Sequence, residues 1–105
     1  MNATDDGQVT LNASGNGTMT FNSGSTRIKK VINKITLICK FGTTSGIVTI
    51  FNNSDRLAEG PLAASVDIDG EGYELLPGRV LRIVISGGPA STKVYATIYY
   101  LREDL

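Results

Sequence analysis

Polar and apolar residues alternate along most of the chain, which is the pattern of a strand that buries one of its faces. Residues 8–13 alternate in this way, and residues 18–22 repeat the pattern with Met19 and Phe21 on one side. The residues between them, 14–17, read Ser-Gly-Asn-Gly, which favours a turn. We therefore expect these two strands to pair as a β-hairpin.

A run rich in β-forming residues extends over residues 27–41, and its apolar phase changes near Asn33. Ile28 and Ile32 have even numbers, whereas the apolar residues that share a face after Asn33 have odd ones. Since a strand changes face at every residue, this shift predicts a bulge or a bend. The apolar spacing over residues 28–37 also fits a helix, but the abundance of Val, Ile and Thr favours a strand.

The second half of the chain predicts further strands that are separated by turns. The expected strands are residues 47–51, 62–68, 73–76, 80–86 and 92–101, and the expected turns are residues 42–46, 52–55, 69–72, 77–78 and 87–89. The nearly continuous apolar run at 47–51 indicates burial on both sides or close packing. About eight strands with turn signals at this spacing are typical of a β-sandwich or a small barrel. We expect one all-β domain, an antiparallel β-sandwich with jelly-roll or immunoglobulin-like topology.

The last expected strand, residues 92–101, carries β-forming residues on both faces. The residues expected to enter the core are Val94, Ala96, Ile98 and Tyr100. Tyr95, Tyr99 and Leu101 then lie on the other face, where a strand exposed to water would alternate with polar residues. This face predicts a contact between copies of the chain. The alternative is that Tyr95, Tyr99 and Tyr100 stack against a sugar or a base.

Composition narrows the possible functions. The 105 residues are 41% apolar, enough for one core, and lack histidine, which removes Ser-His and Cys-His nucleophile pairs and His-bound zinc. Ten basic and ten acidic residues give no net charge, which argues against binding to nucleic acid or an acidic membrane surface. The N-terminal residues lack the basic and apolar regions of a signal peptide, and the apolar runs are too short to span a bilayer.

Few residues suggest site chemistry. Asp67, Asp69 and Glu71 are spaced like half of a calcium loop, but the rest of the loop is missing, so a solvated turn is favoured. Cys39 has the parity of the core residues and is expected to be a buried, unreactive thiol. Six basic residues are expected on a solvated face, with a docking surface as the alternative: Lys29, Lys30, Lys34, Arg79, Arg82 and Lys93. We predict no catalytic residue, no cofactor and no metal site.

The layout of residues 27–100 resembles that of small β-sandwich virion proteins of tailed bacteriophages. The similar features are the strand that begins Arg-Ile-Lys-Lys-Val, the glycine-bounded loop at 42–46, the apolar strand at 47–51, the Pro77-Gly78 turn and the last two strands. This resemblance covers about two-thirds of the chain by pattern. It implies a capsid decoration, head-fibre or tail component that has no catalytic residues. The chain departs from the pattern at residues 8–22.

We therefore expect a structural virion protein, most simply a capsid decoration protein that stabilises the head. Its expected partners are copies of itself and the major capsid protein or another virion protein, and the resemblance implies a trimer. Residues 1–8 are expected to form a flexible arm that contacts the lattice through Met1, Asn2, Ala3, Thr4, Asp5 and Asp6. The alternatives are a carbohydrate-binding or receptor-binding module that uses the tyrosines and residues 67–71, or a tail component.

Overall fold

The computed structural model describes residues 2–39 and 45–105, and all regular elements in these residues are strands. The bounds are β1 Asn2–Thr10, β2 Gly17–Asn22, β3 Ile28–Cys39, β4 Ile47–Asn52, β5 Asp55–Pro61, β6 Ser65–Leu75, β7 Val80–Ser86 and β8 Lys93–Asp104. The expected all-β fold is confirmed, and residues 28–37 form a strand and not a helix. No helix in the described residues is long and apolar enough to cross a membrane.

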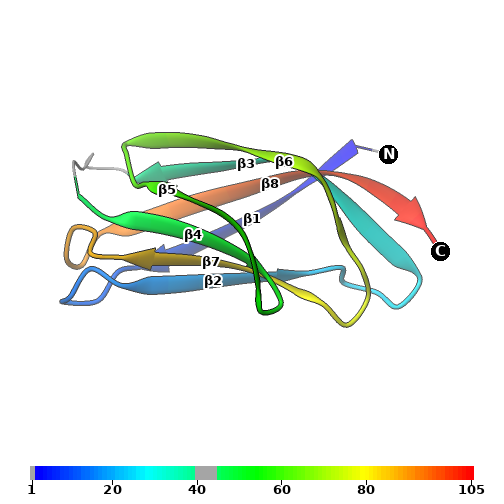
Figure 1. Cartoon of the computed structure of the whole chain (residues 1–105), viewed down its shortest axis with the longest axis horizontal. Coiled ribbons are helices and arrows are strands. Elements are labelled where there is room, and N and C mark those ends of the chain that lie inside the picture. The colour runs from blue at the N-terminus through cyan, green and yellow to red at the C-terminus, as the bar shows by residue number, and fades with distance from the viewer. Residues whose placement is uncertain (1, 40–44) are drawn as a thin grey trace.

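The strands form two four-stranded sheets that pack face to face, in the orders β1-β8-β3-β6 and β2-β7-β4-β5 (Figure 1). Every pairing is antiparallel, and the first strand pairs with the last, the second with the seventh, the third with the sixth and the fourth with the fifth. This nested order is that of a jelly roll. In an immunoglobulin-like fold the first two strands share a sheet, whereas here they lie in opposite sheets.

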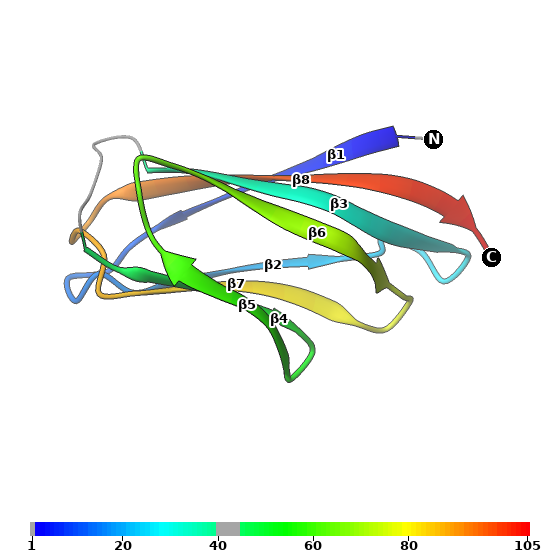
Figure 2. The same cartoon turned by 45° about the horizontal axis from the view of Figure 1, so that its top comes forward.

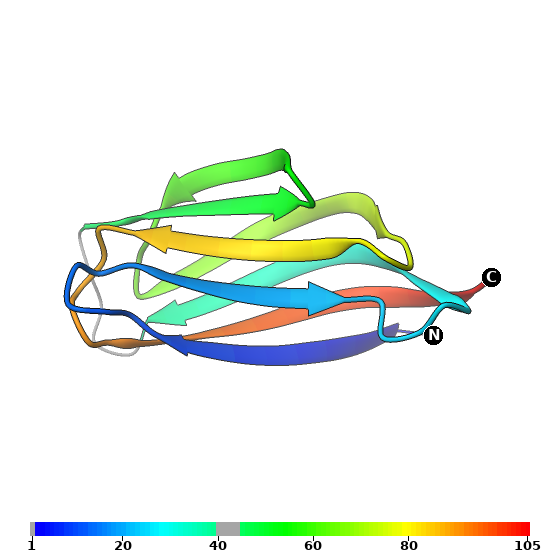
Figure 3. The ribbon, with the colours of Figure 1, turned by 90° about the horizontal axis from the view of Figure 1, so that it is seen from below.

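The hairpin expected over residues 8–22 is wrong. β1 pairs with β8, from Asn2 opposite Leu101 to Thr10 opposite Lys93, and β2 pairs with β7. β1 and β2 therefore belong to different sheets, with the core between them. Both are edge strands, and they border the sandwich on the same side (Figure 3). The turn between them does form, with Asn12 Oδ1 accepting backbone hydrogen bonds at 2.9 and 3.0 Å. The same turn can join two strands of one hairpin or two strands of different sheets. The local sequence therefore does not show which of these connections forms.

The shift expected near Asn33 is confirmed as a bulge. The register of β3 changes between Ile32 and Lys34 against both of its neighbours, β8 and β6. The turn expected at residues 69–72 is wrong, because β6 continues through this segment. Its residues between Asp69 and Tyr73 form an irregularity that faces the bulge, with Glu71 and Gly72 at φ of 50° and 73°.

The core fills the space between the two sheets and is mostly aliphatic. It includes Leu37, Ile83, Ile85 and Val94, all fully buried. Figure 2 shows β5 and β6 following one another at the side of the sandwich opposite β1. The strand β5 has no counterpart among the expected elements because its sequence, DRLAEGP, lacks apolar alternation.

Two other expectations need correction. In β4 the side chains alternate, with Val48 and Ile50 buried and Ile47 48% exposed, so the run at 47–51 buries one face only. The strand expected at 62–68 begins at Ser65, although Leu62 is buried in the connection before it. The loop at 42–46 lies mostly outside the described residues.

The bulge gives the first testable prediction. A Cβ atom at Gly70 would lie 2.3 Å from the backbone oxygen of Ile32, so Gly70→Ala must displace one of two paired strands. We expect a loss of about 2 kcal/mol of unfolding free energy, measured by urea denaturation. Gly60→Ala in β5 is the matched control, because nothing lies within 4 Å of its added Cβ, and it should change stability by less than about 0.5 kcal/mol. Equal effects of the two variants would contradict this account of the bulge.

Candidate functional site

The candidate site is the outer face of the β1-β8-β3-β6 sheet, where β8 contributes its outward residues. The four residues expected in the core, Val94, Ala96, Ile98 and Tyr100, are buried. Tyr95 and Tyr99 are each 37% exposed on the opposite face, and Leu101 is half-buried there. The expected division of β8 into a core face and an outer face is confirmed.

Each outward residue of β8 lies between neighbours from β1 and β3. Tyr95 lies between Gln8 and Ile38, and Ile38 is 48% exposed. Tyr95 and Ile38 therefore form one exposed apolar group. Ile38 was not singled out from the sequence, although its parity is opposite to that of the core residues of β3.

A second group lies further along β8. Leu101 is opposite Val31, and Tyr99 is opposite Lys34, whose Nζ lies 4.6 Å from the centroid of the tyrosine ring. This distance is within the range of a cation–π interaction. The Lys34 ammonium thus makes the surface around Tyr99 more polar than the surface around Tyr95 and Ile38.

A polar row separates the two groups. Thr97 Oγ1 donates to Asp6 Oδ1 and Thr36 Oγ1 donates to Asp67 Oδ1, both at 2.9 Å, and the two threonines are cross-strand partners. Tyr95, Tyr99 and Leu101 therefore share a face, as expected, but do not form one continuous apolar patch.

The flexible arm expected at residues 1–8 is wrong for residues 2–8, which belong to β1. Met1 lies outside the described residues. Asn2, Thr4 and Asp6 are exposed on the outer face, whereas Ala3 and Asp5 are turned toward the other sheet and are half-buried. Residues proposed to contact a lattice would thus do so as part of a strand.

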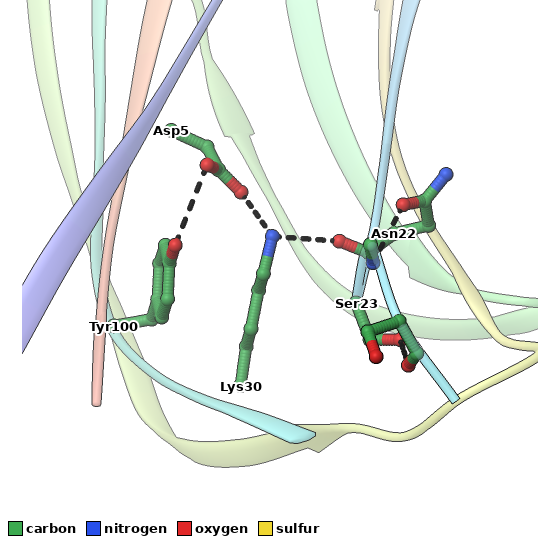
Figure 4. A network of polar contacts seen from close by, with 7 residues as sticks. Asp5, Asn22, Ser23, Lys30 and Tyr100 are labelled. Carbon is green, nitrogen blue, oxygen red and sulfur yellow. Dashed lines mark hydrogen bonds and ion pairs between the residues drawn. The ribbon is translucent and has the colours of Figure 1, made fainter. Parts of the chain in front are cut away.

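A buried polar network holds β1 in place (Figure 4). Lys30 is 7% exposed, and its Nζ donates to Asp5 Oδ2 at 2.5 Å and to the backbone oxygen of Asn22 at 2.9 Å. Tyr100 presents its ring 4.7 Å from the same Nζ and places its hydroxyl 3.5 Å from Asp5 Oδ1. The network joins β1, β3 and β8 of one sheet to the end of β2 in the other.

Lys30 was expected on a solvated face, and its burial is a correction. Its even number places it on the same face as Ile28 and Ile32, so the parity of β3 contained the signal. Neighbouring Lys29 does face outward, where its Nζ lies 3.0 Å from Glu74 and 3.5 Å from Glu103. The hydrogen bond to Glu74 is the main cause that raises the pKa of Lys29 above its ordinary value.

The other candidate groups are accounted for by local contacts. Besides the bond from Thr36 to Asp67, Asp69 Oδ1 accepts from the backbone N–H of Glu71 at 2.8 Å. Within the described residues, no cluster of three His, Cys, Asp or Glu side chains has the geometry to hold a metal ion. Cys39 is 1% exposed, which confirms its expected burial.

An open depression lies beside Tyr99, next to the first residues of β1. It is lined by Asn2, Ala3, Thr4, Asn33, Tyr99 and Tyr100. The bulge of β3 contributes Asn33 to it, and the first residues of β1 contribute one carboxamide and one hydroxyl. This arrangement places hydrogen-bonding side chains next to an exposed aromatic ring.

Comparison of the chain with protein-family models finds no match, and comparison with curated protein sequences finds none either.

The buried network gives the second prediction. Asp5→Ala leaves the Lys30 ammonium without its carboxylate partner, and we expect the free energy of unfolding to fall by about 2 kcal/mol. This loss is smaller than that for breaking a fully buried ion pair because the Asp5 side chain is 33% exposed. Asp6→Ala removes an exposed carboxylate from the next position of β1 and should cost less than about 1 kcal/mol. Chemical denaturation of both variants provides the measurement. Similar losses in both would show that the network does not anchor β1.

Proposed function

We propose that this chain is a non-enzymatic structural protein of a tailed-phage virion, most simply a capsid decoration protein. It is made in the host cytoplasm and resides in the virion. Its partners are copies of itself and the major capsid protein or another virion protein. The observation that carries the proposal is the outer face of the β1-β8-β3-β6 sheet, where large side chains remain exposed at Tyr95, Tyr99 and Ile38.

Three arguments support a binding role for this face. Tyrosine is enriched at protein interfaces because its ring offers apolar contact area and its hydroxyl a hydrogen bond. The strands β8 and β3 lie in the interior of the sheet, so their outward residues rest on a rigid base. The jelly roll is also an architecture of viral capsid domains, although fold alone does not determine function.

The mechanism we propose is stabilisation by mass action. A subunit that binds the assembled lattice more tightly than its free components opposes disassembly with each bound copy. The apolar groups of the outer face would provide the contact between copies, while β1 and the loops approach the lattice. The resemblance to decoration proteins suggests a threefold arrangement of copies, as at the threefold positions of a capsid.

The depression beside Tyr99 favours a second candidate, a carbohydrate-binding or receptor-binding module. An exposed aromatic ring flanked by carboxamides and a hydroxyl suits a sugar, and jelly rolls also occur in lectins. Lys34 lies over the Tyr99 ring and would have to move before a sugar could stack on that side. Because of this obstacle we rank the module second.

Two experiments distinguish the structural virion protein from the binding module: a search for the chain in purified phage particles, and a glycan array. The structural proposal predicts that mass spectrometry finds the chain in virions and that its coding sequence lies among capsid or tail genes. It also predicts no glycan binding. Glycan binding that is lost in Tyr99→Ala, from a chain absent from virions, would replace the structural proposal with the second candidate.

The outer face itself is tested by the double variant Tyr95→Ser with Tyr99→Ser. We expect the variant to keep its circular dichroism spectrum and to form smaller assemblies than the unmodified protein in light scattering. Ile47→Ser is the matched control, since Ile47 is as exposed as Ile38 but belongs to the other sheet. An unchanged mass for the double variant would show that the tyrosine face does not join copies.

A further inference from the structure

The two sheets have four edge strands, and three of them are poor templates for another strand. β6 is interrupted by the irregularity around Glu71, where φ is positive. β5 has a register shift against β4 and ends at Pro61. β2 has six residues, and its last carbonyl oxygen, that of Asn22, already accepts a hydrogen bond from Lys30. Bulges, prolines and short length are the devices that keep sheet edges from pairing.

β1 has no bulge and no proline and is longer than β2, but it carries two charged residues, Asp6 and the inward-pointing Asp5, of a kind that can also protect an edge. It keeps an unbroken register with β8 over nine residues, and it contains no proline, lysine or arginine. Its two carboxylates already have partners, Asp5 with Lys30 and Asp6 with Thr97. Within the described residues, β8 is the neighbour of β1 on one side, and the other side carries no strand. An edge of this kind leaves backbone N–H and C=O groups available for a further strand.

We propose that β1 pairs antiparallel with β1 of a second copy about a twofold axis that lies between the Gly7 residues of the two copies. The two four-stranded sheets then become one continuous sheet of two copies. The inference deepens the self-association in the proposed function and rests on it, but it adds a separate contact along the edge of the sheet. An isologous contact of this type needs a surface that is complementary to itself.

The register follows from the charges of β1. Each side chain must keep its side of the sheet, so residues of equal parity face one another and one residue lies directly opposite its own copy, with the axis between them. An axis at Asp5 or at Asp6 would place that carboxylate directly opposite its own copy, which is destabilising. An axis at Gly7 instead places Asp6 opposite Gln8, and Asp5 opposite Val9. Axes further from the centre of β1 pair fewer residues.

The continuous sheet also extends the outer face across the two copies. Asp6 keeps its bond from Thr97 and gains Gln8 of the second copy as a neighbour, and a carboxamide can donate to a carboxylate. Gln8 in turn lies beside Tyr95 of its own copy. The twofold contact therefore leaves Tyr95 and Tyr99 free for the threefold contact of the proposed function. A threefold contact and a twofold contact that close together give an assembly of six copies.

Disulfide trapping tests this register. The variants Asp6→Cys and Gln8→Cys are purified separately, mixed in equal amounts and oxidised gently, and crosslinked species are identified by mass. The proposal predicts a disulfide between the two different variants and little in either variant alone, because cross-strand partners have Cβ atoms close enough for the bond. Buried Cys39 should remain reduced.

The matched control replaces Asp6→Cys with Asp67→Cys. Asp67 is an exposed aspartate that accepts a threonine hydroxyl as Asp6 does, but it lies on β6 at the far edge of the same sheet. The mixture of Asp6→Cys with Gln8→Cys should crosslink about tenfold faster, or more, than the mixture with Asp67→Cys. Equal rates overturn the edge contact, even if light scattering still shows an oligomer. Rapid crosslinking of Asp6→Cys with itself overturns the register. A strictly monomeric protein overturns the edge contact and the self-association, whereas the virion function is overturned only if the chain is absent from virions.

Discussion

Burial of one face of every strand between two sheets is the constraint on which the rest of the structure depends. A strand turns alternate residues to opposite faces, so an extra residue moves all later side chains to the other face. β3 buries even-numbered residues up to Ile32 and odd-numbered ones from Ile35, and the bulge between them keeps the apolar set inside. The irregular part of β6 lies opposite this bulge, and Gly70 allows the backbone of β6 to approach that of Ile32 closely.

The same constraint explains why a lysine in the core determines the position of the N-terminal segment. Lys30 has the core parity of β3, and a buried ammonium is costly unless it is paired and hydrogen-bonded. Asp5 supplies the carboxylate and the carbonyl of Asn22 a further acceptor, which ties β1 to both sheets. Residues 2–8, which were expected to form an arm, thus belong to an edge strand that is hydrogen-bonded to β8 on one side.

The parts of the fold that depend on local alternation were predictable, and those that depend on distant partners were not. The core face of β8 and the shift at Asn33 follow from period two alone. The pairing of β1 with β8 joins residues at opposite ends of the chain, and β5 is a strand because β4 pairs with it, although its own sequence is polar. In the candidate site, the parity of Tyr95 and Tyr99 was predictable. The polar row that divides them was not, because Asp6 and Thr97 are 91 positions apart.

The central claim is that this protein associates with itself through the β1-β8-β3-β6 sheet. Sedimentation equilibrium of the unmodified chain, from low to high micromolar concentration, tests it most directly because it needs no partner and no substitution. The account predicts a mass that rises with concentration above that of the single 11.2 kDa chain, toward an even multiple of it. A mass of 11.2 kDa at every concentration would contradict the claim.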